Sequence, residues 1–274
     1  HKDEKCLRIC LQNFGGFPVE KGSKDDAIVS FVKDNKVDLL LIPETNLAWH
    51  KLPQTESLKE RYRGVWTDWV GNTAALREIL DPTRRHLEKS KSQAGGVAMM
   101  GFEDITHRVN GRSYDKMGRW CSILLQGRHG TNFRIVTAYR PVRNLTGPLS
   151  VMQQQIRWMK MNKDNRDPRK AFDEDLAREL EKWTEAGEQI ALGIDYNADI
   201  RTAAFNLLLT VPLIPVVTHN HGEGPATCAK NQSSIPIDAI FVSATLSQSR
   251  CGYLSFDEGI PGDHRCLWLD VPLS

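Results

Sequence analysis

The sequence lacks the features that mark a membrane protein, a disulfide-bonded protein or a strongly charged one. No stretch of its 274 residues approaches the roughly 18 apolar residues of a membrane-spanning helix. Its six cysteines include no Cys-x-x-Cys pair, so we expect reduced thiols rather than a disulfide framework. The 36 basic and 34 acidic residues leave a net charge of +2, so binding of a polyanion must depend on local clusters. We therefore expect a soluble, intracellular protein that does not contact a membrane.

Several common catalytic motifs are also missing. We find no Gly-x-Ser-x-Gly elbow, no phosphate-binding loop, no dinucleotide-binding glycine pattern and no cysteine next to a plausible base. His219 and His221 lie two residues apart in a glycine-rich segment, a spacing more typical of surface residues than of a zinc site. These absences disfavour serine and cysteine hydrolases, P-loop enzymes and dinucleotide-binding enzymes.

The hydrophobic pattern alternates strands with helices. Apolar runs typical of strands occupy residues 7–11, 37–42, 95–100, 119–125, 133–138, 189–195, 237–243 and 266–271. Helical spacing begins behind a capping-box pattern at Ser23 and recurs over 171–186. Because each helix separates two strands, we expect crossovers that pack on a sheet. With 40% hydrophobic residues the chain can bury a large core, and we expect one domain over 1–274, with 46–92 as loop and short helix.

Polar side chains follow the ends of these strands. Asp195 and Asn197 come after a buried run, and their spacing places both side chains on one face. An Asx-rich turn would explain this pair alone, but similar residues end other strands. The full set is Asn13, Glu44, Tyr139, Arg140, Asp195, Asn197, Asp238, Asp263 and His264. Carboxylate and amide oxygens are ligands of hard cations such as Mg²⁺. The set therefore predicts metal-assisted attack of water on a phosphoryl group.

In this order the motifs resemble those of the endonuclease/exonuclease/phosphatase superfamily. The motifs are Gln12-Asn13, Pro43-Glu44, Tyr139-Arg140-Pro141, Asp195-Tyr196-Asn197, Ile237-Asp238-Ala239-Ile240-Phe241-Val242-Ser243 and Asp263-His264. The chain is most similar to the apurinic-type endonuclease domain of retrotransposons. This resemblance implies an α/β fold, a two-layer β-sandwich flanked by helices that forms a four-layer α/β sandwich. The chain departs from the family at Ile194, where Gly is usual, and at Gly262, where Ser is common.

The resemblance also implies a metal site and a phosphate-binding histidine. Glu44, Asn13 and Asp263 would hold Mg²⁺, or Mn²⁺ in its place. His264 would hydrogen-bond the phosphate and stabilise its developing charge, with Asp238 fixing the imidazole. The physical argument agrees, because an imidazole held by a carboxylate is favoured as a cation facing an anion.

The remaining motif residues would act on water and phosphate, again by resemblance. Asp195 would orient or deprotonate the attacking water, and Asn197 would bind the phosphoryl oxygens. Tyr139 would contact the scissile phosphate, with assistance from Arg140. Whether Asp195 or His264 is the general base stays open, because a sequence contains no distances or proton positions.

A basic segment follows the Tyr139 motif. Residues 155–170 contain six basic and two acidic side chains, with Trp158 between them. Arg157 and Lys160 in this segment are candidates for binding the nucleic-acid backbone, next to an aromatic stacking surface. The alternative is a connector whose aromatics pack inward and whose charges are solvated. A second basic cluster, at 108–119, favours a solvated turn over a phosphate-facing hairpin.

Taken together, the sequence predicts a Mg²⁺-dependent hydrolase of phosphodiester bonds. The leading hypothesis is a DNA endonuclease that nicks one strand by in-line attack of water and leaves 3′-hydroxyl and 5′-phosphate ends. The alternatives are an RNA nuclease, a phosphoinositide or nucleotide phosphatase, and a catalytically inactive binding module on the same scaffold. We expect nucleic acid, specifically DNA, as partner, and a monomeric domain of a larger polyprotein that acts in the nucleus.

Overall fold

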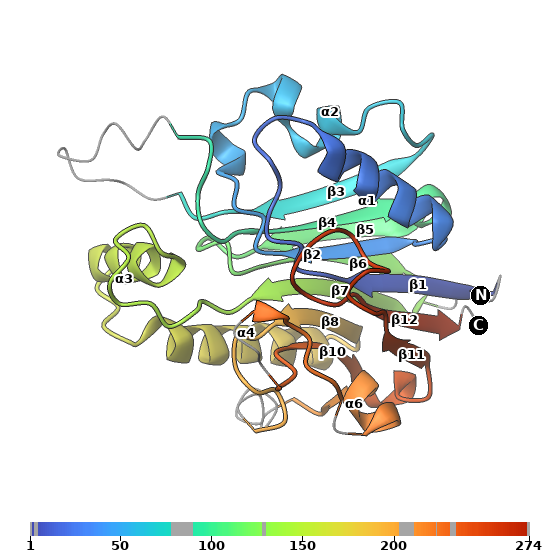
Figure 1. The fold of residues 1–274 in the computed structure, drawn as a ribbon. Helices are drawn as coiled ribbons and strands as arrows, with labels where there is room; N and C mark the ends of the chain where they lie inside the picture. The colour runs from blue at the N-terminus through green and yellow to red at the C-terminus, as the bar shows by residue number, and fades with distance from the viewer. Residues whose placement is uncertain are drawn as a thin grey trace.

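Two six-stranded mixed sheets pack face to face in the computed structural model, which describes residues 2, 5–77, 90–127, 130–202, 211–222, 224–230 and 234–272 (Figure 1). The first sheet contains, in spatial order, β11 (Arg250–Tyr253), β12 (Leu267–Pro272), β1 (Cys6–Leu11), β2 (Leu39–Pro43), β4 (Val97–Phe102) and β3 (Trp69–Ala74). The second contains β5 (Val109–Tyr114), β6 (Trp120–Gln126), β7 (Asn132–Tyr139), β8 (Gln189–Asp195), β10 (Asp238–Ser243) and β9 (Leu213–Pro215).

Helices cover the outer face of each sheet, so the molecule has four layers. The first sheet is covered by α1 (Ser23–Asp34) and the one-turn α2 (Leu58–Arg61), and the second by α4 (Pro168–Glu185) (Figure 1). Helix α3 (Val151–Met161) contacts α4, and α6 (Val216–His221) contacts β10 and β11. Short 3₁₀ helices occupy Trp49–Lys51, Gln54–Glu56, Glu103–Arg108 and Ala244–Leu246. The expected four-layer α/β sandwich is thus confirmed. No helix in the described part of the chain has the length and apolarity that a membrane crossing requires.

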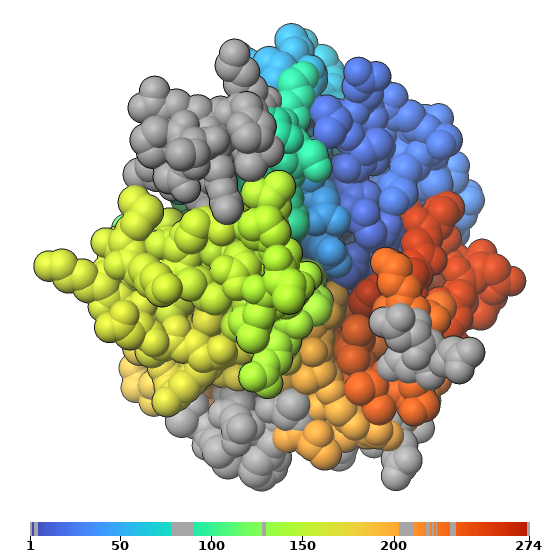
Figure 2. Space-filling view, turned by 60° about the vertical axis from the view of Figure 1, so that its left-hand side comes forward, coloured from blue at the N-terminus to red at the C-terminus, as the bar shows by residue number. Residues whose placement is uncertain are grey.

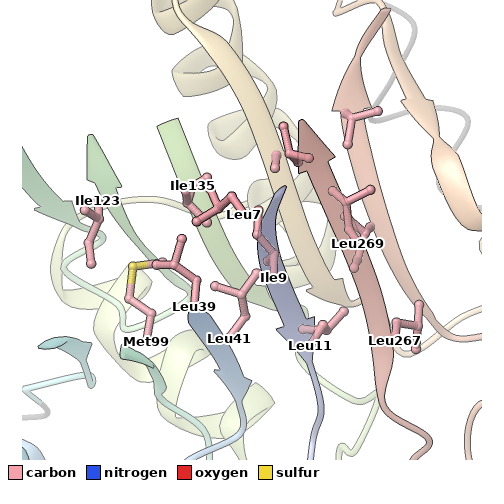
Figure 3. Packing of buried hydrophobic residues seen from close by; sticks show 14 of the residues in the cluster. Leu7, Ile9, Leu11, Leu39, Leu41, Met99, Ile123, Ile135, Leu267 and Leu269 are labelled. Atoms are coloured by element: carbon pink, nitrogen blue, oxygen red, sulfur yellow. The ribbon is translucent and has the colours of Figure 1, made fainter. Parts of the chain in front are cut away.

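Alternate side chains of each central strand fill two different layers of the core. Leu7, Ile9 and Leu11 of β1 point between the two sheets, together with Leu39 and Leu41 of β2 (Figure 3). The intervening residues of the same strands pack outward, against the helical layer. A further cluster lies between the second sheet and α4. Burying one aliphatic side chain of this size stabilises the fold by about 1.5–3 kcal/mol, which explains why the central strands are continuous apolar runs.

Two parallel strand pairs direct their carboxyl ends to the same end of the sandwich. β1 pairs with β2 in parallel, and β7 pairs with β8 in parallel; the other named pairs are antiparallel. Helix α1 forms the first crossover and α4 the second, as the sequence predicts, whereas α3 lies in a segment for which the sequence analysis predicts no helix. The marked chain termini lie at the opposite end from α3 (Figure 1).

Three local predictions were wrong or incomplete. Strand β3 lies within the segment expected as loop and short helix; Gly71 and Asn72 are poor strand formers, and pairing with β4 overrides their preference. The residue that caps α1 is Gly22 rather than Ser23, with the Asp25 carboxylate accepting from its backbone N–H. In the basic cluster at 108–119, Arg119 is buried and pairs with acidic side chains instead of facing solvent.

Candidate active site

Three polar side chains lie side by side across the second sheet. Tyr139 at the end of β7 is in register with Asp195 at the end of β8, and Asp195 is in register with Asp238 at the start of β10. All three are almost completely buried. Strand pairing alone therefore brings a phenol and two carboxylates together from distant parts of the chain.

The first sheet contributes Asn13 and Glu44 to the same place. Asn13 lies just beyond β1, and Glu44 follows β2 in a left-handed backbone conformation with φ of 56°. The Asn13 amide nitrogen Nδ2 donates to Glu44 Oε2 at 2.7 Å and to Asp195 Oδ2 at 2.9 Å. One amide thus connects a carboxylate of the first sheet, Glu44, with a carboxylate of the second, Asp195, so the site forms only where the two sheets meet.

His264 reaches the site from the segment before β12. Its Nδ1 lies 2.7 Å from Asp238 Oδ2, and both side chains are buried. Burial alone would lower the pKa of His264, but the charge and hydrogen bond of Asp238, together with Cys228 and Asp195, outweigh burial and raise the pKa to about 12. The ring is therefore an imidazolium at neutral pH and can stabilise an anion.

Asp195 lies in the most strongly acidic part of the cluster. Burial raises the pKa of Asp195 to about 8, and the charge of Asp238 adds to this rise, while His264 and the Asn13 amide oppose it. Burial is the main cause of this raised pKa, and the charges of Asp238 and Glu44 add to it, so the site disfavours a further negative charge. A carboxyl group with a pKa near the working pH can take up a proton from water.

Tyr139 and Asn197 complete the group near the phosphate-binding position. Burial and the nearby charge of Glu44 raise the pKa of Tyr139 well above its ordinary value, so the phenol keeps its proton. Asn197 has a left-handed backbone with φ of 52°, its N–H donates to Asp195 Oδ1, and its Nδ2 donates to the Arg140 carbonyl. The turn after β8 therefore holds the Asn197 side chain beside Tyr139 and Asp195.

Arg140 lies next to the site, but its guanidinium points into the protein. It binds both oxygens of Asp173, at 2.9 and 2.7 Å, and its Cζ lies 4.4 Å from the centre of the Tyr196 ring. Arg169 supports the same region by donating to the carbonyl of Asn197 at 3.1 Å. Arg140 therefore positions the chain around Tyr139, and any contact with substrate requires its ion pair with Asp173 to open.

The two other candidate substrate-binding residues lie on α3. Arg157 donates to the carbonyl of Pro148 at 2.7 Å, and Lys160 is exposed to solvent. Figure 2 shows the end of the molecule where residues 140–170, drawn yellow-green, lie next to the blue amino-terminal residues and the orange segments near residue 195. The basic helix is therefore on the same face as the strand ends. The side chains of His219 and His221 lie outside the described part of the structure, so their assignment to the surface stays a prediction.

Asp263 binds a lysine that the sequence motifs did not reveal. Lys230 Nζ lies 2.5 Å from Asp263 Oδ2. Burial alone would raise the pKa of Asp263, but the hydrogen bond to Lys230 and the charge of His264 hold it below its ordinary value. Gly262, where the motif resemblance leads us to expect Ser, has a steric reason to be glycine, because a Cβ there would lie 2.6 Å from the Cα of Phe14.

Three further residues hold the segments around His264 and Asp238 in place, a role that the sequence motifs did not predict. Gln12 accepts from the N–H of Ile260 at 2.9 Å and donates to the carbonyls of Ile260 and His264, so β1 fixes the histidine segment directly. Thr227 Oγ1 accepts from the N–H groups of Ile237 and Asp238 and fixes the start of β10. Cys228 forms an isolated β-bridge with His264.

The donor set fits a hard divalent cation. Carboxylate oxygens of Glu44 and Asp195 lie beside the Asn13 amide, and Asp263 lies near Gly15; Mg²⁺ is commonly held by one or two carboxylates together with substrate phosphate. Two groups in the described residues have ligand atoms within 4.8 Å of one another, namely Asp195 with Asp238 and His264, and Cys228 with Asp263 and His264. The charges of Asp238 and Glu44 add to the effect of burial on the pKa of Asp195, and a cation bound beside these carboxylates would offset them.

Known structures resemble the chain, although no protein-family model and no curated protein sequence matches it. An AP endonuclease from Leishmania major superposes with a TM-score of 0.68 at 12% identity, over 98% of this chain and 88% of that one. An AP endonuclease from Archaeoglobus fulgidus gives 0.63 at 15% identity, over 96% and 98%. The chain has the AP endonuclease-like fold. A 3′ phosphatase from Neisseria, bound to a product DNA hairpin, gives 0.63 at 15% identity, over 97% and 99%.

Proposed function

We propose that this protein is a divalent-metal-dependent phosphodiesterase that nicks DNA and leaves 3′-hydroxyl and 5′-phosphate ends. The observation that carries the proposal is the convergence of the Asn13-linked carboxylates of Glu44 and Asp195 with the Asp238–His264 pair. Oxygen ligands for a cation thus adjoin a buried imidazolium, the combination that hydrolysis of a phosphodiester requires.

Each side chain of the site has a separate role in the proposed hydrolysis. His264 donates a hydrogen bond to a phosphate oxygen, and Asp238 keeps the ring charged and oriented. Asn197 and Tyr139 bind the other phosphoryl oxygens as neutral donors. Asp195 orients the attacking water and accepts its proton.

Glu44, Asn13 and Asp263 would hold Mg²⁺ or Mn²⁺ at the rim of this group. The bound cation supplies charge stabilisation to the phosphate and a binding site for its oxygens. The 2.7 Å contact of Asn13 Nδ2 with Glu44 keeps the metal-side carboxylate oriented toward the site.

The exposed basic face of α3 supports DNA as the substrate. Arg157 and Lys160 lie on the segment that follows Tyr139, so a phosphate backbone bound to α3 can extend over the strand ends. The Neisseria protein of the same fold is a 3′ phosphatase bound to a DNA hairpin. The order of motifs from Asn13 to His264 further supports an origin in a retrotransposon polyprotein, for which nuclear action on chromosomal DNA is the expected role.

A plasmid assay tests the proposal. Supercoiled DNA is incubated with Mg²⁺ and wild-type protein, Asp195→Ala, His264→Ala or the control Asp199→Ala, which removes a nearby aspartate whose partner is Arg201. We expect nicked circles from wild type and control, a loss of about 100-fold or more for the two site variants, and resealing of the nicks by DNA ligase. Hydrolysis of RNA or a phosphoinositide, with the plasmid left intact, would refute the DNA assignment. Binding of DNA without any turnover would favour an inactive binding module.

A further inference from the structure

A cysteine lies against the histidine of the candidate active site. Cys228 is buried, pairs with His264 in an isolated β-bridge, and its thiol hydrogen-bonds the imidazole. One ligand atom from each of Cys228, Asp263 and His264 lies within 4.8 Å of the other two. The tetrahedral sites that proteins provide for Zn²⁺ are built from these three side-chain types. The combination differs from the oxygen ligands around Glu44, which suit Mg²⁺.

The histidine is oriented as zinc-binding histidines are. Its Nδ1 is 2.7 Å from Asp238 Oδ2, which leaves Nε2 for a cation. A carboxylate behind a metal-bound imidazole fixes the tautomer and strengthens the ligand. The Oδ1 atom of Asp238 has no hydrogen-bond partner within the described residues, so this carboxylate retains capacity to stabilise added positive charge.

Asp263 can contribute the third ligand without losing its lysine. Lys230 occupies Oδ2 at 2.5 Å, and a carboxylate has a second oxygen that can bind a cation. Three protein ligands leave the fourth tetrahedral position to water or to a phosphate oxygen.

We propose that Cys228, Asp263 and His264 form a binding site for a zinc-class divalent cation, which shares Asp263 with the Mg²⁺ position at Glu44, and that its occupation inhibits hydrolysis. On binding, the Cys228 thiol and the Nε2–H of the His264 imidazolium each release a proton to solvent, and the thiolate coordinates the cation. Nε2 of His264 then coordinates the cation and cannot donate to phosphate. The binding site is independent of the proposed function, whereas the inhibition depends on it.

Cobalt binding tests the site without reference to activity. Co²⁺ is titrated in the absence of Mg²⁺ into wild type, Cys228→Ser and the control Cys6→Ser, which changes a thiol at the start of β1. We expect a one-to-one complex with a cobalt–thiolate charge-transfer band in wild type and control, which added Zn²⁺ abolishes. In Cys228→Ser the band is lost and the affinity falls by about 100-fold, since removing even an outer-shell partner costs about 10- to 100-fold. Absence of the band in wild type, or its persistence in Cys228→Ser, would overturn the site.

Inhibition is measured separately, as nicking of plasmid in excess Mg²⁺ with increasing Zn²⁺. We expect the zinc concentration for half-inhibition to rise by about 100-fold in Cys228→Ser. Nicking by each protein is normalised to its own rate without zinc, and an unaltered thermal unfolding transition shows that the variant is folded. Equal inhibition of both proteins would overturn the inhibitory role. If cobalt binds as expected and no protein nicks DNA with Mg²⁺, the metal site stands and the nuclease assignment fails.

Discussion

Replacing Asp238 by Asn removes the charge that keeps His264 protonated. The two side chains approach to 2.7 Å, so at an effective dielectric constant of about 20 their attraction is about 6 kcal/mol. At about 1.36 kcal/mol for each unit, this is roughly four pKa units. Starting from about 12, a value that already includes the effect of burial, the pKa of His264 in Asp238→Asn falls to about 8.

The consequence is a new pH dependence in the neutral range. In wild type the imidazole stays protonated between about pH 6 and 9, whereas in the variant it loses its proton as the pH rises. Loss of a charged donor to phosphate costs about 10²- to 10³-fold in rate. We therefore expect the ratio of variant to wild-type kcat/KM to fall by up to about 10-fold per pH unit above the pKa of the variant's His264.

The assay is nicking of a labelled DNA duplex at saturating Mg²⁺ over this pH range. Asp238→Asn also removes part of the charge that raises the pKa of Asp195, so a fall in the ratio is assigned to His264 only toward about pH 9, where Asp195 is mostly ionised in both proteins. His264→Ala is the control, because it lacks the titrating ring. The ratio of its kcat/KM to that of wild type therefore contains no contribution from ionisation of His264 in the variant. A ratio for Asp238→Asn that stays near one, or that is flat with pH, would refute the role of the imidazolium.

Three other substitutions test separate parts of the structure. Gly262→Ser introduces the residue that the motif resemblance leads us to expect, but its Cβ clashes with the backbone after β1. We therefore expect the free energy of unfolding, measured with heat or urea, to fall by about 1–3 kcal/mol and activity to decrease. Unchanged stability would contradict the packing. Arg140→Ala leaves Asp173 without its bidentate partner, so we expect about 3 kcal/mol of destabilisation, with the salt dependence of DNA binding unaltered. Lys160→Ala should weaken DNA binding at low salt and reduce the slope of log K against log salt by about 0.9, without changing the melting temperature; an unaltered slope would remove α3 from the DNA interface.

The parallel strands and the residues at their ends were predictable because each signal is local. The apolar runs of β1, β2 and β8 and the helical stripe of α4 define two crossovers, and crossovers bring the carboxyl ends of their strands together. Asn13, Glu44 and Asp195 therefore meet where the sequence places them.

Contacts between loops could not be predicted in this way. The bridge between Cys228 and His264 and the ion pair between Lys230 and Asp263 depend on how two irregular segments lie against each other. No periodic pattern encodes such a contact. The inward direction of the Arg140 guanidinium could not be predicted either, because it depends on Asp173 of α4, which lies 33 residues further along the chain.

Because the His264 segment is attached to Gln12, the candidate site can form only after the carboxyl-terminal part of the chain has been synthesised. Gln12 forms three hydrogen bonds with Ile260 and His264, and β1 pairs with β12, which follows them in the chain. A ribosome completes the amino-terminal strand long before its partner emerges, so a nascent or truncated chain lacks the histidine and its support. Such a chain can expose carboxylates but cannot assemble the complete candidate site, which forms only when Gln12 and the His264 segment have come together.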